Sequence, residues 1–134
     1  MAPPAAPAYT PSRMVSLQLF KNSADARPYP AGATIFSVGD IGDYMYVIVE
    51  GTVRISLEGH VLEVLGPGGV FGEIALIDNG PRSADAVAVT DCRLVPIDEP
   101  WFKFLVQQTP YFSLQIMRIM ADRLRHMKDK LTPA

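Results

Sequence analysis

Residues 70–89 read VFGEIALIDNGPRSADAVAV and decide the fold, because they place two strand-like ends around one short helical turn. Gly72 removes a side chain at a point where the backbone must come close to another group. Residues 73–76 predict a single helical turn, and the free N–H groups at a helix start suit a phosphate. Arg82 adds a planar fork of donors that pairs with phosphate oxygens. The stretch therefore predicts an anion site.

Three neighbouring residues refine the chemistry of this site. Ser83 and Ala84 put a hydroxyl and unobstructed N–H groups beside the same anion. Glu73 is the unexpected member, because a carboxylate repels a phosphate. An ionised carboxylate does accept hydrogen bonds from hydroxyls, so it fits a ligand that carries both groups. A phosphate and a sugar hydroxyl together indicate a nucleotide. The alternative is a structural ion pair between Glu73 and Arg82 across a loop.

The stretch resembles the phosphate-binding cassette of the cyclic nucleotide-binding domain family. The family pattern is F-G-E-[IL]-A-L, a short loop, then P-R-[ST]-A, and residues 71–76 and 81–84 match it without mismatch. The resemblance covers roughly residues 17–131. It implies that Glu73 binds a ribose 2′-hydroxyl and that Arg82 binds a cyclic phosphate. The cassette residues expected to bind the ligand are Phe71, Gly72, Glu73, Ile74, Ala75, Arg82, Ser83 and Ala84.

Short strand-like runs with glycine-rich turns fill the region from residue 27 to residue 97. Such even, close spacing predicts a β-sandwich or barrel. The resemblance sharpens this to a mainly β fold with flanking α-helices, namely a jelly-roll β-barrel that carries the cassette. The PAGATIF and YVIVEGTV runs, at residues 30–36 and 46–53, are similar to the family's barrel. Residues 27–32 are expected to form a strand followed by a turn, and further strands are expected at residues 34–36, 44–49, 52–57, 61–65, 87–90 and 93–97.

Two helices are predicted after the strands, over residues 98–131. Asp98 can cap a helix over residues 101–108, and Pro100 suits its first turn. Residues 111–130 predict a long amphipathic C-terminal helix, with an apolar stripe at heptad-like spacing. Two interpretations stay open: the stripe packs on its own domain, or it pairs with a second copy. The stripe comprises Leu114, Met117, Met120, Leu124, Met127 and Leu131.

A nucleotide base needs an apolar wall and a lid. By family position the resemblance implies Ile55, Leu57 and Leu62 for the wall, and the long C-terminal helix for the lid. On that helix Arg123 is the predicted ligand contact. It can stack on the base as a cation–π partner or reach Glu73.

Composition limits the possible classes of protein. The 134 residues suit a Pro/Ala-rich disordered tail over residues 1–13 and one domain over residues 14–134. A net charge of −2 lacks the clustered basic surface that nucleic-acid binding needs. We expect no membrane span and no secretory signal. The lone Cys92 excludes an internal disulfide and favours the cytoplasm.

The leading hypothesis is a sensor module, not an enzyme, that binds cyclic nucleotide and relays binding through movement of its C-terminal helix. Ser83 is compatible with both cAMP and cGMP, and the resemblance favours cAMP, because similar family members with a P-R-S-A run commonly bind it. We expect no separate cofactor. The predicted partners are the cyclic nucleotide, an unknown effector protein and a second copy that pairs through the C-terminal helix.

Three other functions compete with the sensor module. A DNA-binding regulator needs a recognition helix, and the sequence ends at Ala134 without room for one, so we expect no DNA binding unless the chain is a fragment of a larger regulator or channel. A metal enzyme on a similar barrel needs several histidines, whereas the sequence holds only His60 and His126. A nucleotide-independent platform for dimerisation or interaction is the remaining alternative.

Overall fold

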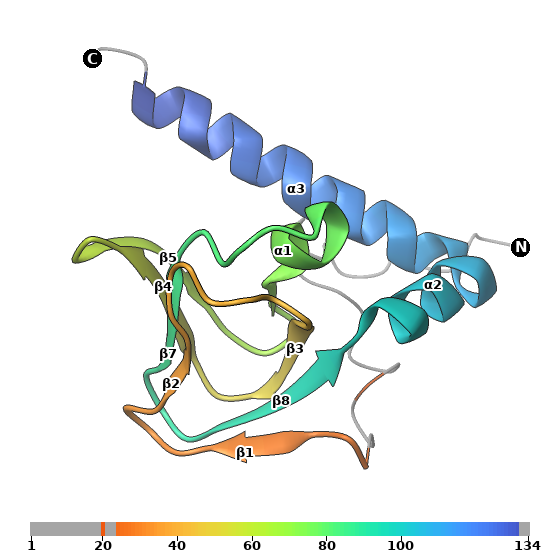
Figure 1. Cartoon of the computed structure of the whole chain (residues 1–134), viewed down its shortest axis with the longest axis horizontal. Coiled ribbons are helices and arrows are strands. Elements are labelled where there is room, and N and C mark those ends of the chain that lie inside the picture. The colour runs from red at the N-terminus through yellow and green to blue at the C-terminus, as the bar shows by residue number, and fades with distance from the viewer. Residues whose placement is uncertain (1–19, 21–23, 132–134) are drawn as a thin grey trace, which may run out of the picture.

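The computed structural model describes Phe20 and residues 24–131, with side chains up to residue 126. The predicted tail over residues 1–13 lies outside this part. The elements, shown in Figure 1, are the strands β1 (Arg27–Tyr29), β2 (Thr34–Phe36), β3 (Met45–Glu50), β4 (Val53–Leu57), β5 (His60–Leu65), β6 (Val70–Phe71), β7 (Asp85–Ala88) and β8 (Cys92–Ile97), and the helices α1 (Glu73–Asp78), α2 (Glu99–Gln108) and α3 (Pro110–Leu131).

The strands form two antiparallel sheets of four. One has the order β1-β8-β3-β6 and the other β2-β7-β4-β5. Eight antiparallel strands shared between two sheets in this way form a jelly roll. The predicted mainly β fold with flanking helices is confirmed. Figure 1 shows α3 running across one side of the barrel, next to α1.

The strand β3 is buried on both faces, which explains its uninterrupted apolar sequence. Tyr46 and Ile48 point between the two sheets, into the core that also holds Phe71 and Leu94. The alternate residues, such as Val47, point to the opposite face. This face is covered by the helices.

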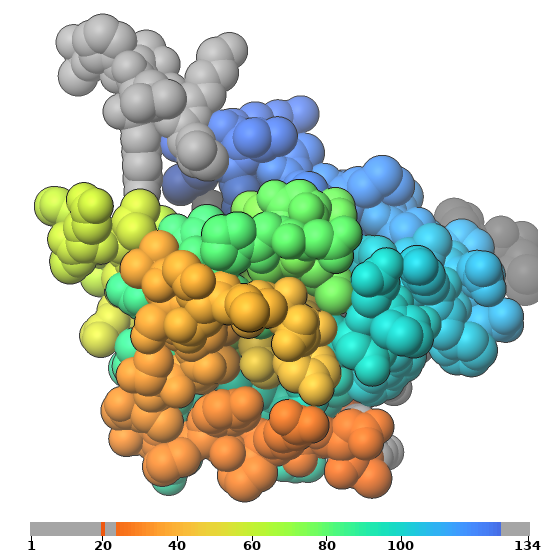
Figure 2. All heavy atoms as spheres, viewed as in Figure 1, coloured from red at the N-terminus to blue at the C-terminus, as the bar shows by residue number. Residues whose placement is uncertain are grey.

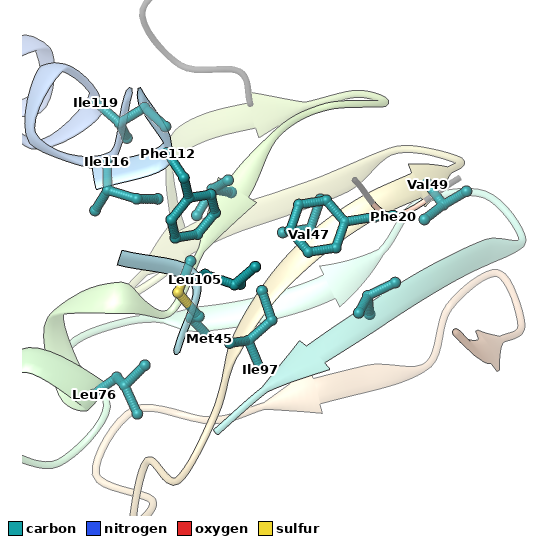
Figure 3. Close-up of a cluster of buried hydrophobic side chains, with 12 residues drawn as sticks. Phe20, Met45, Val47, Val49, Leu76, Ile97, Leu105, Phe112, Ile116 and Ile119 are labelled. Atoms are coloured by element: carbon teal, nitrogen blue, oxygen red, sulfur yellow. The ribbon is translucent and has the colours of Figure 1, made fainter. Parts of the chain in front are cut away.

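The second core joins the helices to the sheet (Figure 3). Leu105 of α2 and Phe112 and Ile116 of α3 pack with Phe20 against β3 and β8. Phe112 and Phe20 are fully buried, with ring centroids 6.2 Å apart. Because α3 is seated by this core, its position relative to the cassette is defined.

Several predicted boundaries differ from the structure by one or two residues. β7 begins at Asp85 rather than at residue 87, because Asp85 pairs with Ser56 on β4. β8 begins at Cys92, which is buried and pairs with Tyr29. α1 runs to Asp78 instead of ending at residue 76. It stops where Asn79 adopts a left-handed conformation.

The helix predictions are confirmed in position and corrected in orientation. The Asp98 carboxylate accepts a hydrogen bond of 2.9 Å from the backbone N–H of Trp101, as expected for a cap. Within the described residues the apolar stripe of α3 packs on its own domain only through Met120, because Leu114, Met117 and Leu124 are exposed. Phe112, Ile116 and Ile119 are the residues that pack inward, while the side chains of Met127 and Leu131 lie outside the described part. None of the described helices is both long and apolar enough to cross a membrane.

Candidate functional site

Gly72 sits between β6 and α1 with a positive φ of 81°. A Cβ there would lie 2.6 Å from Nη1 of Arg82 and 3.3 Å from the carbonyl oxygen of Tyr44. Only glycine tolerates both the backbone conformation and this close approach. The predicted close contact is therefore present, and the group that comes close is the Arg82 side chain.

The Arg82 guanidinium is held by backbone oxygens and an aromatic ring. Its Nη1 donates to the Gly72 carbonyl at 3.0 Å, and its Nη2 donates to the Tyr44 carbonyl at 2.6 Å. The guanidinium carbon lies 4.1 Å from the ring centroid of Phe36, a cation–π contact. Arg82 is only 4% exposed, and this burial lowers its pKa from the ordinary value.

The loop between β2 and β3 fixes the backbone of Arg82. The Arg82 N–H donates to the Asp40 carbonyl at 2.8 Å, and the Gly39 N–H donates to the Arg82 carbonyl at 2.8 Å. Gly42 lies against the side chain, since a Cβ there would be 3.0 Å from Arg82 Nε. The loop therefore places Arg82 from both its backbone and its side chain.

Glu73 is the first residue of α1 and is 1% exposed. Its Oε1 accepts a hydrogen bond from Nη1 of Arg123 on α3. Arg123 also donates from Nη2 to the Val70 carbonyl and from Nε to Oε2 of Glu63, the latter at 3.1 Å. Burial alone would lower the pKa of Arg123, but the charges of Glu73 and Glu63 outweigh it and raise the pKa. Of the two contacts predicted for Arg123, the one with Glu73 is present.

Glu73 and Arg82 form no ion pair with each other in the described part of the chain. Glu73 pairs with Arg123, whereas Arg82 bonds to two carbonyls. The alternative of a structural Glu73–Arg82 pair is wrong, because each side chain is drawn to a different partner. Each of these two side chains also keeps one buried atom without a hydrogen-bond partner in the described part of the chain, namely Glu73 Oε2 and Arg82 Nε.

The other predicted residues fall into two groups. Phe71, Ala75 and Ala84 are buried, so their side chains support the cassette from within, whereas Ile74 and Ser83 are exposed. In the predicted wall, Ile55 and Leu57 are half-buried on β4 and Leu62 is exposed on β5. A ligand-binding role for each of these residues stays a prediction.

The site also contains residues that the sequence analysis missed. Phe36 lies under Arg82 and Gly42 lies beside it. Glu63 is joined to Arg123. Each comes from a loop or strand outside the cassette. The one available signal was Glu63, the single charge within the apolar run of residues 61–65.

Comparison with known proteins now identifies the family. The family model described as "Cyclic nucleotide-binding domain" matches residues 26–109. The chain belongs to the cyclic nucleotide-binding domain family. The match contains the whole cassette and the barrel, while Arg123 lies beyond it, on α3.

Relatives within the family include regulators and channels. The chain is 39% identical over 104 residues to a cyclic AMP receptor protein of Thermus thermophilus, covering 74% of this chain and 48% of that protein. It is 39% identical over 97 residues to a cyclic nucleotide-gated potassium channel of Rhizobium etli, covering 72% and 27%. The crystal structure of the Thermus thermophilus catabolite activator protein aligns with a TM-score of 0.72 at 37% identity, covering 79% of this chain and 52% of that one. The chain thus spans about half the length of these relatives, or less.

Proposed function

We propose that this cyclic nucleotide-binding domain binds cAMP in preference to cGMP, between the cassette and α3, and passes the signal on through the position of α3. Phe71 to Ala75 and Arg82 to Ala84 would surround the phosphate and ribose. Ile55, Leu57 and Leu62 would line the base. The proposal concerns binding, and the chemistry of the site calls for no catalytic step.

The observation that carries this proposal is a buried guanidinium without an anion. Arg82 is 4% exposed, and none of the described carboxylates forms an ion pair with it. Buried charges in proteins are normally paired, because desolvation of a single charge is costly. A cyclic phosphate supplies the missing anion. It would also receive hydrogen bonds from the exposed Ser83 and from backbone N–H groups at the start of the cassette.

Glu73 supports the proposal that the ligand carries a ribose hydroxyl. Its Oε2 is a buried acceptor without a hydrogen-bond partner in the described part of the chain. A ribose hydroxyl is a neutral donor, so it can satisfy this oxygen while Oε1 remains bonded to Arg123. A nucleoside monophosphate is a ligand that carries both a phosphate for Arg82 and a ribose hydroxyl for Glu73.

The proposed preference for cAMP over cGMP rests on the similarity of this chain to a relative. A Thermus thermophilus relative with 39% identity is named a cyclic AMP receptor protein. Ser83 is compatible with either nucleotide. The base preference is therefore the part of the proposal that most needs direct measurement.

The relay rests on Arg123, which joins α3 to Glu73 and to the Val70 carbonyl. A ligand that binds more tightly when α3 lies over the cassette shifts the population toward that position. In Figure 2 the cassette helix α1 (green) lies between the β2 region (orange) and α3 (blue), so the ligand and α3 would meet at this place.

Calorimetric titration of nucleotide-free protein with cAMP, and separately with cGMP, tests the proposal. We expect saturable binding of cAMP with a dissociation constant in the micromolar range or tighter, and weaker binding of cGMP. Tighter binding of cGMP would overturn the base preference alone. No heat with either nucleotide, from protein shown to be folded by circular dichroism, would overturn nucleotide binding.

One observation favours a second function, that of an interaction platform. The exposed residues Leu114, Met117 and Leu124 form an apolar stripe along α3. Such a stripe on a surface helix commonly marks an interface. Failure of the titration would make this the leading function, either alone or as part of a longer regulator or channel.

A further inference from the structure

Glu63 has an unusual place for a charged residue. It lies on β5, the edge strand of its sheet, and its side chain is only 11% exposed. Its neighbours Leu62 and Val64 are apolar and exposed. Side chains alternate between the two faces of a strand, so the ordinary pattern here is reversed: the carboxylate points inward and the apolar side chains point outward.

Stability alone does not explain this arrangement. A desolvated ion pair is often no more stabilising than well-packed apolar residues of similar volume, because the cost of desolvation offsets the attraction. An apolar residue on the inner face of β5 would cover α3 equally well. The specific consequence of Glu63 is that it holds one atom of Arg123, the Nε, at 3.1 Å from its Oε2.

The Arg123 guanidinium links the contact with Glu63 to the cassette. Its nitrogen atoms are coplanar and fixed relative to one another, so fixing Nε also orients Nη1 and Nη2. Nη1 donates to Oε1 of Glu73, and Nη2 donates to the Val70 carbonyl. Glu63 on β5 therefore influences the Glu73 carboxylate on α1, through a residue of α3.

We propose that Glu63 is a positioning residue of the nucleotide site. By holding Arg123 it keeps Glu73 in the orientation in which Oε2 accepts the ribose 2′-hydroxyl. It also ties β5 to α3 while α3 lies over the cassette. This inference rests on the proposed function, because it assigns Glu63 a role only if Glu73 binds the ribose.

The test compares the affinities for cAMP and for 2′-deoxy-cAMP by calorimetry, in wild-type protein and in Glu63→Gln. Glutamine keeps the shape and removes the charge. We expect the variant to lose roughly five- to twentyfold in affinity for cAMP, the usual effect of weakening one charged hydrogen bond. Affinity for 2′-deoxy-cAMP should hardly change, because that ligand lacks the hydroxyl that Glu73 accepts.

A matched control and a double-mutant cycle complete the design. Glu50 forms a 3.1 Å ion pair with Arg93 at the surface, so Glu50→Gln removes a similar pair away from the site and should leave both affinities unchanged. In an Arg123→Gln background, Glu63→Gln should have no further effect, because Glu63 acts through Arg123. Thermal unfolding of each variant establishes that it is folded. If Glu63→Gln does not fold, Glu63→Asp, which keeps the charge on a shorter side chain, is measured for the same ratio.

The outcomes separate this inference from the proposed function. A selective loss for cAMP that vanishes without Arg123 supports the inference. An equal loss for both ligands, or none, in protein that binds cAMP would overturn the positioning role and leave the nucleotide site intact. A wild-type chain that binds neither ligand would overturn the proposed function and the role of Glu63 with it.

Discussion

Arg82 stands at the centre of the site because it is buried, cationic and bonded only to neutral groups. We expect Arg82→Ala to weaken cyclic nucleotide binding by roughly 2–5 kcal/mol, the cost of leaving a desolvated charge without its partner. Calorimetry with cAMP measures this. Arg82→Lys keeps the charge but cannot bond both the Gly72 and Tyr44 carbonyls, so it should recover only part of the affinity. Wild-type affinity in folded Arg82→Ala would contradict the assignment.

Gly42 gives a steric test of the same site. A Cβ at this position would lie 2.4 Å from the Ala75 Cβ and 3.0 Å from Arg82 Nε. Gly42→Ala should therefore lower the free energy of unfolding by about 1–3 kcal/mol, the usual cost of overpacking, and weaken nucleotide binding by displacing Arg82. Thermal unfolding and calorimetry measure the two effects. Gly66→Ala is the control, because a Cβ there meets nothing within 4 Å. Equal stability and equal nucleotide affinity of the two variants would show that the protein accommodates a Cβ at Gly42 without cost.

Tyr46 predicts how stability depends on alkaline pH. Burial raises the pKa of Tyr46 to about 12, with a further contribution from Tyr29. Above pH 10 the unfolded chain loses this proton while the folded chain keeps it, so the free energy of unfolding falls as pH rises from about 10 to about 12. Tyr46→Phe should reduce this loss by about 2 kcal/mol, since two pKa units correspond to roughly 2.7 kcal/mol. Denaturant unfolding at pH 9 and pH 12 measures it, and an unchanged pH dependence would show that another group is responsible.

At the level of single residues, the prediction and the structure agree within the cassette and at Arg123, which reaches Glu73 as expected. Glu73 and Arg82 were predicted because the motif fixes their spacing, and the structure buries both. Phe36 and Glu63 were not, because nothing in the sequence says that β2 and β5 approach the same cassette. Their contribution depends on tertiary packing between segments far apart in the chain.

At the level of elements, the sequence predicted the helix α3 but not the face by which it packs. The helix carries two apolar faces, one with Ile116 and Ile119 and the other with Leu114, Met117 and Leu124. Periodicity detects apolar residues but not the surface that covers them. The face with Ile116 and Ile119 packs on the domain because β3 and Leu105 form an apolar surface against it.

The orientation of α3 predicts that two alanine variants of this helix differ in stability. Ile119 is fully buried, so Ile119→Ala should destabilise the fold by about 2–5 kcal/mol through lost burial and a cavity. Leu124 is 66% exposed, so Leu124→Ala should change stability by less than about 0.5 kcal/mol in dilute protein. Urea unfolding measures both. If the two variants were equally destabilised, the orientation of α3 described above would be wrong.

At the level of the whole molecule, α3 connects the sheet to the cassette. Its inner face is seated on the sheet through Phe112 and Ile116, and further along the helix Arg123 reaches Glu73 and Glu63. Under the proposed function, a ligand on the cassette would act on the second half of a helix whose first half is anchored. The expected response is a change in the second half, the same half that carries the exposed Leu124.

The exposed stripe then predicts association of two copies. Leu114, Met117 and Leu124 are 39%, 58% and 66% exposed, and they follow one another at helical spacing on the face opposite the domain core. Pairing with the same stripe of a second copy would remove these side chains from water, which favours association in proportion to the apolar area buried.

We expect sedimentation equilibrium to show a monomer–dimer exchange in wild-type protein. Leu124→Glu should abolish it, because the paired helices would bury a carboxylate without a partner. Lys103→Glu, on the exposed surface of α2, is the charge-changing control and should leave the dimer intact. If cAMP moves the second half of α3, it should shift the wild-type exchange and leave Leu124→Glu monomeric. A wild-type chain that stays monomeric with and without cAMP would mean that the stripe serves a different protein.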